Sequence, residues 1–190
     1  LILVAIPMFI FMGTMLEKSG VAKDLLYALQ IMLRRVPGGL ALSVTIMGTI
    51  MAATTGIIGA SVVMMTLLAL PVMLERSYDK SLSTGTIAAS GTLGILIPPS
   101  IMLVIMADLL AISVGTLFVA SIFPGLLLAI LYFIYLFLRT RLNPSIAPPL
   151  PESVGPSNFK EKLKLVFKSF LPPIFLIVLV LGSIFAGFAT

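Results

Sequence analysis

The 190-residue chain contains no cysteine and no histidine, and only 10% of its residues are charged. The first two absences exclude disulfide frameworks, thiol chemistry, haem ligation and the usual zinc sites. The scarcity of charge, together with 59% hydrophobic residues, excludes a soluble domain, whose apolar share is nearer about 45–50%. The net charge of +5 does not indicate nucleic-acid binding, because the basic residues fall at the ends of apolar segments. The composition predicts an all-α polytopic membrane protein.

The basic residues divide the chain, because they occur only in residues 18–35, 76–80, 139–141 and 160–168. Short loops rich in lysine and arginine stay in the cytoplasm. The chain begins and ends inside apolar segments, so we expect both ends to be cut. The expected order is the end of a transmembrane helix at 1–16, an amphipathic interfacial helix at 17–36, a re-entrant hairpin at 37–75, a broken transmembrane helix at 81–109, a transmembrane helix at 115–138, a cytoplasmic linker at 139–168 and the truncated start of a second half at 169–190.

The hairpin is predicted from residues 37–74, which carry no charge and have basic clusters on both sides. The chain must therefore enter and leave the membrane by the same face. Split at its Gly/Thr-rich centre, the segment leaves arms at 40–53 and 60–74, each about 21–23 Å long as a helix. A bilayer core is about 30 Å thick, which favours a re-entrant hairpin with its tip near mid-membrane. The alternative is two full helices joined by a tight outer turn.

The broken helix is predicted from the G-T-L-G-I-L-I-P-P-S run at residues 91–100, inside a charge-free stretch long enough to cross a membrane. Glycines loosen the backbone and prolines remove amide donors, so carbonyls of residues 93–96 lose their helical partners. Orphaned backbone groups persist in a bilayer only where they line a protein-buried or watery cavity, commonly one that holds an ion or substrate. This interruption predicts a transporter.

Four motifs carry a resemblance to a known family. They are A-I-P-M-F-I-F-M-G at residues 5–13, A-T-T-G-I-I-G-A-S at 53–61, A-A-S-G-T-L-G-I-L-I-P-P-S-I at 88–101 and I-F-P-G-L-L-L at 122–128. Together, and in this order, they resemble the large membrane subunit of tripartite ATP-independent periplasmic (TRAP) transporters, the DctM family. The resemblance runs along nearly the whole chain. It implies that about half of the usual large subunit is missing.

The resemblance implies an elevator-type transporter half rather than an enzyme. It implies sodium symport of small organic acids across a bacterial or archaeal inner membrane, with Na⁺ as coupling ion and no further cofactor. The implied partners are a small four-helix membrane subunit and an extracytoplasmic substrate-binding protein. A stand-alone sodium-coupled carboxylate carrier of the ion-transporter type would share hairpins and broken helices and is the alternative function. An intramembrane protease would need a Ser/His dyad, paired aspartates or a zinc motif.

The resemblance also assigns site residues. At the hairpin tip and the broken helix these are Thr54, Thr55, Gly56, Gly59, Ser61, Ser90, Gly91, Thr92, Gly94, Pro98 and Pro99, with Na⁺ at Thr55, Gly56, Ser90 and Thr92. Sodium is a hard cation, and hydroxyls and unwound carbonyls supply the oxygen ligands it needs. A substrate carboxylate would favour the exposed amides where Ala60 and Ser61 begin the second arm. The alternative for each Ser or Thr is a hydroxyl bonded to its own helix or packed between helices.

The hairpin tip departs from the commonest family pattern. Many members have a second S-G where this chain has Ile57, Ile58 and Gly59, so side-chain ligands do not transfer to Ile58 and more backbone coordination is expected. The T-T-G-I-I-G-A-S form is closer to members assigned to keto acids or related monocarboxylates. Asp108 is expected near the outer end of the broken helix, where a solvated or capping role is favoured over that of an intramembrane functional carboxylate.

Overall fold

The computed structural model describes residues 2–55, 58–150 and 159–187, with side chains described for 7–16, 18–51, 58–150 and 160–187. These ranges hold helices and connections and no strand, so the predicted all-α fold class is confirmed. The elements are α1 (Ile2–Lys18), α2 (Val21–Met32), α3 (Gly39–Thr55), α4 (Ile58–Glu75), α5 (Lys80–Thr92), the 3₁₀ turn η1 (Leu93–Ile95), α6 (Ile101–Leu109), α7 (Val114–Leu142), the 3₁₀ turn η2 (Pro144–Ile146) and α8 (Phe159–Phe185).

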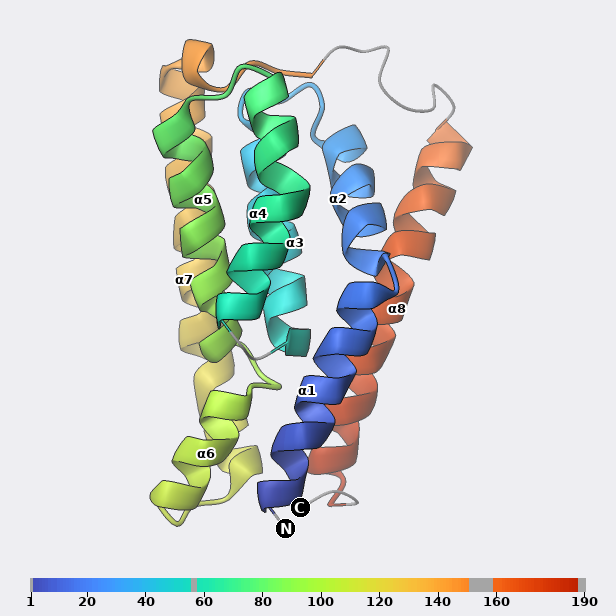
Figure 1. Cartoon of the computed structure of the whole chain (residues 1–190), viewed down its shortest axis with the longest axis vertical. Coiled ribbons are helices and arrows are strands. Elements are labelled where there is room, and N and C mark those ends of the chain that lie inside the picture. Colours follow the sequence, from blue (N-terminus) through green and yellow to red (C-terminus); the bar gives the residue numbers. More distant parts are fainter. Residues whose placement is uncertain (1, 56–57, 151–158, 188–190) are drawn as a thin grey trace.

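Three described helices are long and apolar enough to cross a membrane, judged by length and composition: Ile58–Glu75, Val114–Leu142 and Lys160–Phe185. α7 has 29 residues and is about 44 Å long, well beyond the roughly 30 Å of a bilayer core. Figure 1 shows α7 and α8 running along most of the long axis on opposite sides of the molecule. Their outward side chains are apolar, as the 76% exposure of Phe123 on α7 illustrates. These helices confirm a multi-pass membrane protein.

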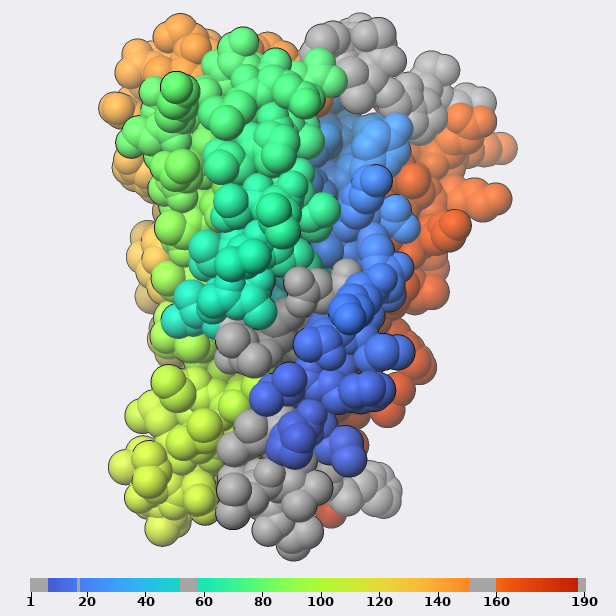
Figure 2. All heavy atoms as spheres, viewed as in Figure 1, coloured from blue at the N-terminus to red at the C-terminus, as the bar shows by residue number. Residues whose placement is uncertain are grey.

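Helices α3 and α4 form the predicted hairpin and are antiparallel neighbours. Figure 1 shows their joined ends partway along the long axis, at the level where the chain between α5 and α6 leaves the helical path. The outer side of α4 lies at the front of Figure 2 and is apolar, with Val63 and Leu67 exposed. α4 has 18 residues and is long enough to cross a membrane. The choice between a re-entrant hairpin and two spanning helices therefore stays a prediction.

Helix α2 has one apolar and one polar side. Leu25 and Leu29 are buried, whereas Lys23 and Asp24 are exposed. The apolar side contacts α3 and α8, and Figure 1 shows α2 alongside these helices rather than across their ends. The interfacial position expected for residues 17–36 is a placement relative to the bilayer and stays a prediction.

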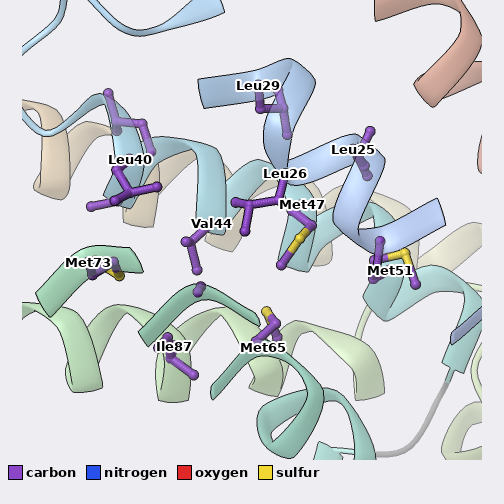
Figure 3. Packing of buried hydrophobic residues seen from close by; sticks show 14 of the residues in the cluster. Leu25, Leu26, Leu29, Leu40, Val44, Met47, Met51, Met65, Met73 and Ile87 are labelled. Atoms are coloured by element: carbon purple, nitrogen blue, oxygen red, sulfur yellow. The ribbon is translucent and has the colours of Figure 1, made fainter. Parts of the chain in front are cut away.

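The main core lies where α2, α3, α4 and α5 meet (Figure 3). Met47 and Met51 of α3 and Met65 and Met73 of α4 are all fully buried. Lipid tails are as apolar as leucine, so contact between these helices is driven by van der Waals packing rather than by transfer from water. Unbranched methionine adapts its shape to irregular gaps, which suits it to this role. The core holds α3 between α2 on one side and α4 and α5 on the other.

Residues 143–150, which we call the strap, cross the end of the bundle where α7 finishes. The amide of Gly38 donates to the carbonyl of Ala147 at 3.0 Å, and that of Asp79 donates to Ile146 at 2.9 Å. In return, Leu150 N–H donates to the Arg34 carbonyl at 3.0 Å. The first part of the expected cytoplasmic linker therefore has fixed partners at the bases of both α3 and α5.

Helix α8 begins earlier than the sequence suggested. The cytoplasmic linker was expected to continue to residue 168, ahead of Pro172 and Pro173. In the structure one helix runs from Phe159 through both prolines to Phe185. Each proline forfeits a single backbone hydrogen bond, and the contacts of α8 with α2 and α3 keep the helix continuous.

Candidate functional site

The interruption between α5 and α6 lies where the prolines predict it. α5 ends at Thr92, η1 follows, and α6 begins at Ile101. Pro98 and Pro99 are buried and have no amide hydrogen to continue a helix. Part of the lost hydrogen bonding is replaced locally, since Leu93 O accepts from Ile97 N at 3.0 Å. The Ser100 hydroxyl, fully buried, donates to Ile95 O at 3.2 Å.

The interrupted segment packs directly against the backbone of α7. A β-carbon on Gly125 would lie 3.1 Å from the Leu96 carbonyl oxygen and 3.1 Å from Ile97 Cγ1. A side chain here would push its neighbours away by a few tenths of an ångström, so glycine at this position serves close approach rather than conformational freedom. This contact gives the I-F-P-G motif a physical reason, because its glycine accommodates the broken helix.

Both arms of the hairpin meet α5 at a pair of small residues, Ser90 and Gly91. A β-carbon on Gly48 of α3 would lie 2.7 Å from Ser90 Cβ. A β-carbon on Gly91 would collide with Val62 of α4. α3 and α4 also contact η1. The fold thus brings the two arms of the hairpin and the start of the interruption together, as the predicted site requires.

The hydroxyl groups at this junction have specific partners. Ser90 Oγ donates to Thr45 Oγ1 at 3.4 Å, and Thr45 Oγ1 donates to Ala41 O at 3.1 Å. Ser90 and Thr45 are both buried. Thr92 Oγ1 donates to Ala89 O at 2.7 Å, which is the helix-bonded state typical of Ser and Thr in apolar helices. Each oxygen keeps lone pairs that can accept a donor or a cation.

The predicted hairpin residues are described only in part. Gly56 lies outside the described residues, as do the side chains of Thr54 and Thr55 at the end of α3. Ser61 is fully buried, Ala60 half-buried and Gly59 exposed with open space around it. Of the predicted sodium set, Ser90 and Thr92 therefore have a described place, and their pairing with Thr55 and Gly56 stays a prediction.

The remaining predicted residues of the broken helix, Gly94, Pro98 and Pro99, are buried. Asp108 is exposed at the end of α6, away from the hairpin contacts. Within the described ranges, no group of three or more Asp and Glu residues could hold a metal ion. A cation bound in this part of the chain would thus depend on hydroxyl and carbonyl oxygens.

Sequence reasoning missed a cavity of about 480 Å³ that lies between α5 and α7 and reaches Thr45 of α3. Thr86 of α5 lines it, and the Thr86 hydroxyl is buried with no hydrogen-bond partner among the described residues. A buried hydroxyl without a partner costs about 1–3 kcal/mol. The spacing of Thr86 and Ser90 places both on one side of a helix, which is a signal the sequence contains. Their proximity to Thr45 depends on tertiary packing and has no such signal.

Burial alters the acid–base chemistry at the base of the hairpin. Tyr78 lies in the turn between α4 and α5, where burial raises the pKa of its phenol to about 12. The hydrogen bond that its oxygen accepts from Leu40 N–H, at 3.2 Å, lowers the pKa and opposes the larger effect of burial. This neutral phenol links the start of α3 to the turn before α5.

The sequence matches known transport proteins along its whole length. The family model described as tripartite ATP-independent periplasmic transporter, DctM component, matches residues 1–190. The C4-dicarboxylate TRAP transporter large permease protein DctM of Vibrio cholerae is 34% identical over 188 residues, which are 99% of the chain and 40% of that relative. The isethionate TRAP transporter permease protein DctMQ of Oleidesulfovibrio alaskensis is 34% identical, covering 99% of the chain and 29% of the relative.

A third relative, the ectoine TRAP transporter large permease protein TeaC of Halomonas elongata, is 30% identical over 97% of the chain and 42% of its own length. The chain thus spans about two fifths of the length of the Vibrio and Halomonas relatives. The family model leaves no part of the chain unmatched, and it confirms the resemblance carried by the four motifs. The chain belongs to the DctM family of tripartite ATP-independent periplasmic transporters.

Proposed function

We propose that the chain is part of the membrane-embedded large subunit of a sodium-coupled transporter that imports small organic acids. In this proposal an extracytoplasmic binding protein delivers the substrate, and a small four-helix subunit completes the membrane complex in a bacterial or archaeal inner membrane. The relatives' names include a C4-dicarboxylate, isethionate and ectoine, all of them small and polar. The same membrane machinery serves different acids in different members, and we assign this one to keto acids or related carboxylates.

One observation carries the proposal: the interruption after α5 lies against both arms of the hairpin. Backbone without helical partners is costly in a bilayer and is kept where it lines a site. The arms approach this place through Gly48 and Gly91, whose lack of side chains leaves room for close contact. A protein that served only as a scaffold would gain nothing from an interruption at this contact.

The kind of atoms gathered there supports the proposal of sodium coupling. Ser90 and Thr92 place hydroxyl oxygens on the last turn of α5, where the helix dipole adds partial negative charge. Na⁺ is transported rather than retained, so a site made of neutral oxygens with moderate affinity suits the task better than a cluster of carboxylates. In the proposal, Thr55 and Gly56 complete the sodium site from the hairpin tip.

Substrate binding is assigned to the start of α4. Ala60 and Ser61 lie near the N-terminal end of this helix, where the helix dipole favours an anion. A carboxylate held there would lie near the sodium site, and the attraction between the two ligands would couple their binding. Such coupling is reciprocal, so sodium would strengthen substrate binding as much as substrate strengthens sodium binding.

The complete large subunit with its small partner, reconstituted in proteoliposomes, provides the test of the function. An inward sodium gradient and the candidate binding protein are added separately and together, with radiolabelled pyruvate or succinate as substrate. Accumulation only when both are present is the expected result. Uptake driven by sodium alone would indicate a stand-alone carrier, and uptake independent of both would refute the mechanism.

Two variants test the assigned positions. Thr92→Ala removes a proposed oxygen ligand and should raise the sodium concentration for half-maximal uptake about five- to tenfold, which corresponds to about 1 kcal/mol. Ala60→Trp should block uptake without preventing membrane insertion. Thr84→Ala is the matched control, because the Thr84 hydroxyl is exposed on the same helix and bonded to Lys80 O. Unchanged sodium dependence in Thr92→Ala together with normal uptake in Ala60→Trp would remove the site assignment.

A further inference from the structure

The cavity between α5 and α7 has two facing walls. On α5 it is lined by Leu82, Thr86 and Ala89, which recur at helical spacing on one side. On α7 the lining residues are Tyr132, Tyr135, Leu136 and Arg139. Gly85 also lines the cavity, and a β-carbon there would have no atom within 4 Å. The absence of a side chain at Gly85 thus leaves space open between two helices.

The inner end of the cavity is polar. Thr86 is only 4% exposed, and its hydroxyl has no hydrogen-bond partner among the described residues. Ser90 and Thr45 lie beside it and are already bonded to each other. A buried hydroxyl normally has a partner, so the Thr86 O–H requires an acceptor from whatever fills the cavity. A volume of about 480 Å³ lies within the range of small-molecule sites.

The outer end of the cavity favours a negative ligand. Arg139 is exposed there, and no described acidic side chain forms an ion pair with it. Asp79 also lines this end, and its carboxylate, which caps α5 by accepting from Leu82 N–H at 2.9 Å, opposes an anion, so the ligand would have to bind on the Arg139 side. Tyr132 and Tyr135 also line the wall. Arginine, tyrosine and the unpaired threonine are donors, so together they match an acceptor-rich group such as a carboxylate.

We propose that this cavity is a second binding site for the carboxylate group of a small organic acid, with Arg139 at its mouth and the Thr86 hydroxyl at its inner end. The site is separate from the hairpin tip and shares only Ser90 with the residues assigned there. Its lining residues Asp79 and Arg139 belong to segments 76–80 and 139–141, which the charge rule places in the cytoplasm. The identity of the ligand as a transported acid rests on the proposed function.

A cation fits this cavity less well. The inner hydroxyls offer few oxygen ligands, and Thr45 and Ser90 already share one hydrogen bond. The Arg139 guanidinium repels a cation and attracts an anion, and Asp79 at the same end offsets part of this effect. An acid released from the membrane-centred site would thus encounter a favourable electrostatic field on its way to the cytoplasm.

The chain's lack of cysteine makes chemical labelling the direct test. A Gly85→Cys variant is made in the complete large subunit, freed of any other cysteine and assembled with its small partner in inside-out membrane vesicles. The rates of modification by an anionic and by a cationic methanethiosulfonate are compared. We expect the anionic reagent to be favoured about tenfold or more relative to a Ser145→Cys variant, whose position is exposed and outside the cavity. Ala89→Cys is used if Gly85→Cys is not recovered.

Protection then identifies the ligand. Pyruvate or succinate should slow modification of Gly85→Cys and leave Ser145→Cys unchanged. Arg139→Gln and Thr86→Val should each weaken protection several-fold, whereas Arg141→Gln should not, because Arg141 stacks on the Phe137 ring outside the cavity. Equal rates with both reagents, or no protection by either acid, would overturn the proposal. Protection by inorganic phosphate as strong as that by the acids would also overturn it, in favour of an unselective anion site.

The labelling needs neither a sodium gradient nor the binding protein, so its result is independent of the uptake experiment. Loss of protection with intact sodium-coupled uptake would reject the second site alone. Gly85→Leu adds a functional check, since a β-carbon at this position has no atom within 4 Å and a leucine would occupy the open space. It should abolish protection, whereas Gly182→Leu, at an equally open position on α8, should have no effect.

Discussion

Substituting Gly48 by alanine tests the closest approach of the hairpin to the broken helix. The new β-carbon would lie 2.7 Å from Ser90 Cβ and 3.3 Å from Ser90 O, whereas ordinary contacts begin at 3.4 Å. Its third neighbour is the Met65 sulfur at 3.2 Å, on a flexible side chain that can move aside. The conflict with Ser90 cannot be relieved in this way, because it involves the first side-chain atom and the backbone of α5. The two helices must therefore separate.

The net effect of Gly48→Ala on stability is the difference between a packing cost and a gain in helix propensity. Overpacking a close contact costs about 1–3 kcal/mol, while replacing glycine by alanine inside a helix gains about 1 kcal/mol. Gly48→Ala should thus destabilise the protein by up to about 2 kcal/mol. Ser90→Gly removes the opposing β-carbon, so the double variant should recover the overpacking cost. The expected coupling energy between the two positions is about 1–3 kcal/mol, within the range for residues in direct contact.

Unfolding of the complete large subunit by SDS in mixed micelles, followed by far-UV circular dichroism, would measure this coupling. Thr84→Gly is the matched control, because it introduces glycine at an exposed position on the same helix without relieving a contact. A coupling energy near zero between Gly48→Ala and Ser90→Gly would refute the packing of α3 on α5 described above. So would equal rescue by Thr84→Gly.

The remaining predictions concern the bases of α3 and α5. Burial raises the pKa of the Tyr78 phenol to about 12 in the folded protein, whereas the unfolded chain loses this proton near pH 10. The free energy of unfolding should therefore be unaffected below pH 10 and fall by about 3 kcal/mol towards pH 12. Comparing the pH dependence of unfolding with that of Tyr78→Phe would check this, and identical profiles would contradict it. Gly38→Ala should lower the free energy of unfolding more than Gly20→Ala does. Both glycines have a positive φ, 75° and 80° respectively, but of the two only Gly38 faces another side chain, that of Thr140. Equal losses in a denaturant titration would show that backbone conformation alone decides. Asp79→Ala should cost about 1 kcal/mol by removing the cap on α5, and Asp79→Asn should restore most of that stability if the cap is the cause.

The features predicted best from the sequence are those set by neighbouring residues. Pro98 and Pro99 end the helical path before Ile101, as the sequence predicts. The connection between the expected segments 81–109 and 115–138 contains Ala111, which has a positive φ of 53°. Charge and hydropathy mark such boundaries directly, because each depends on a few residues of local sequence.

The features that could not be predicted depend on contacts between distant residues. The Thr45–Ser90 hydrogen bond joins two helices, and the Thr140 hydroxyl donates to Pro37 O at 3.0 Å from the far end of α7. Neither contact leaves a periodic or compositional signal. The start of α8 at Phe159 also lies before the predicted end of the linker, because the prolines at 172–173, a type of residue that favours helix starts, lie inside this helix. The cavity belongs to the same class, as its walls come from α5 and α7.

The strap has a mechanical consequence. Its hydrogen bonds with Arg34, Gly38 and Asp79 connect the end of α7 to the bases of α3 and α5. Each such bond contributes about 0.5–1.5 kcal/mol net. If α7 slides along the hairpin during a transport cycle, residues 143–150 have two alternatives. They move with the hairpin while α7 bends near its end, or their hydrogen bonds break at a cost of about 2–4 kcal/mol. If the hydrogen bonds break, the conformation with α7 displaced would be populated at only a few per cent or less, unless new contacts replaced the lost ones.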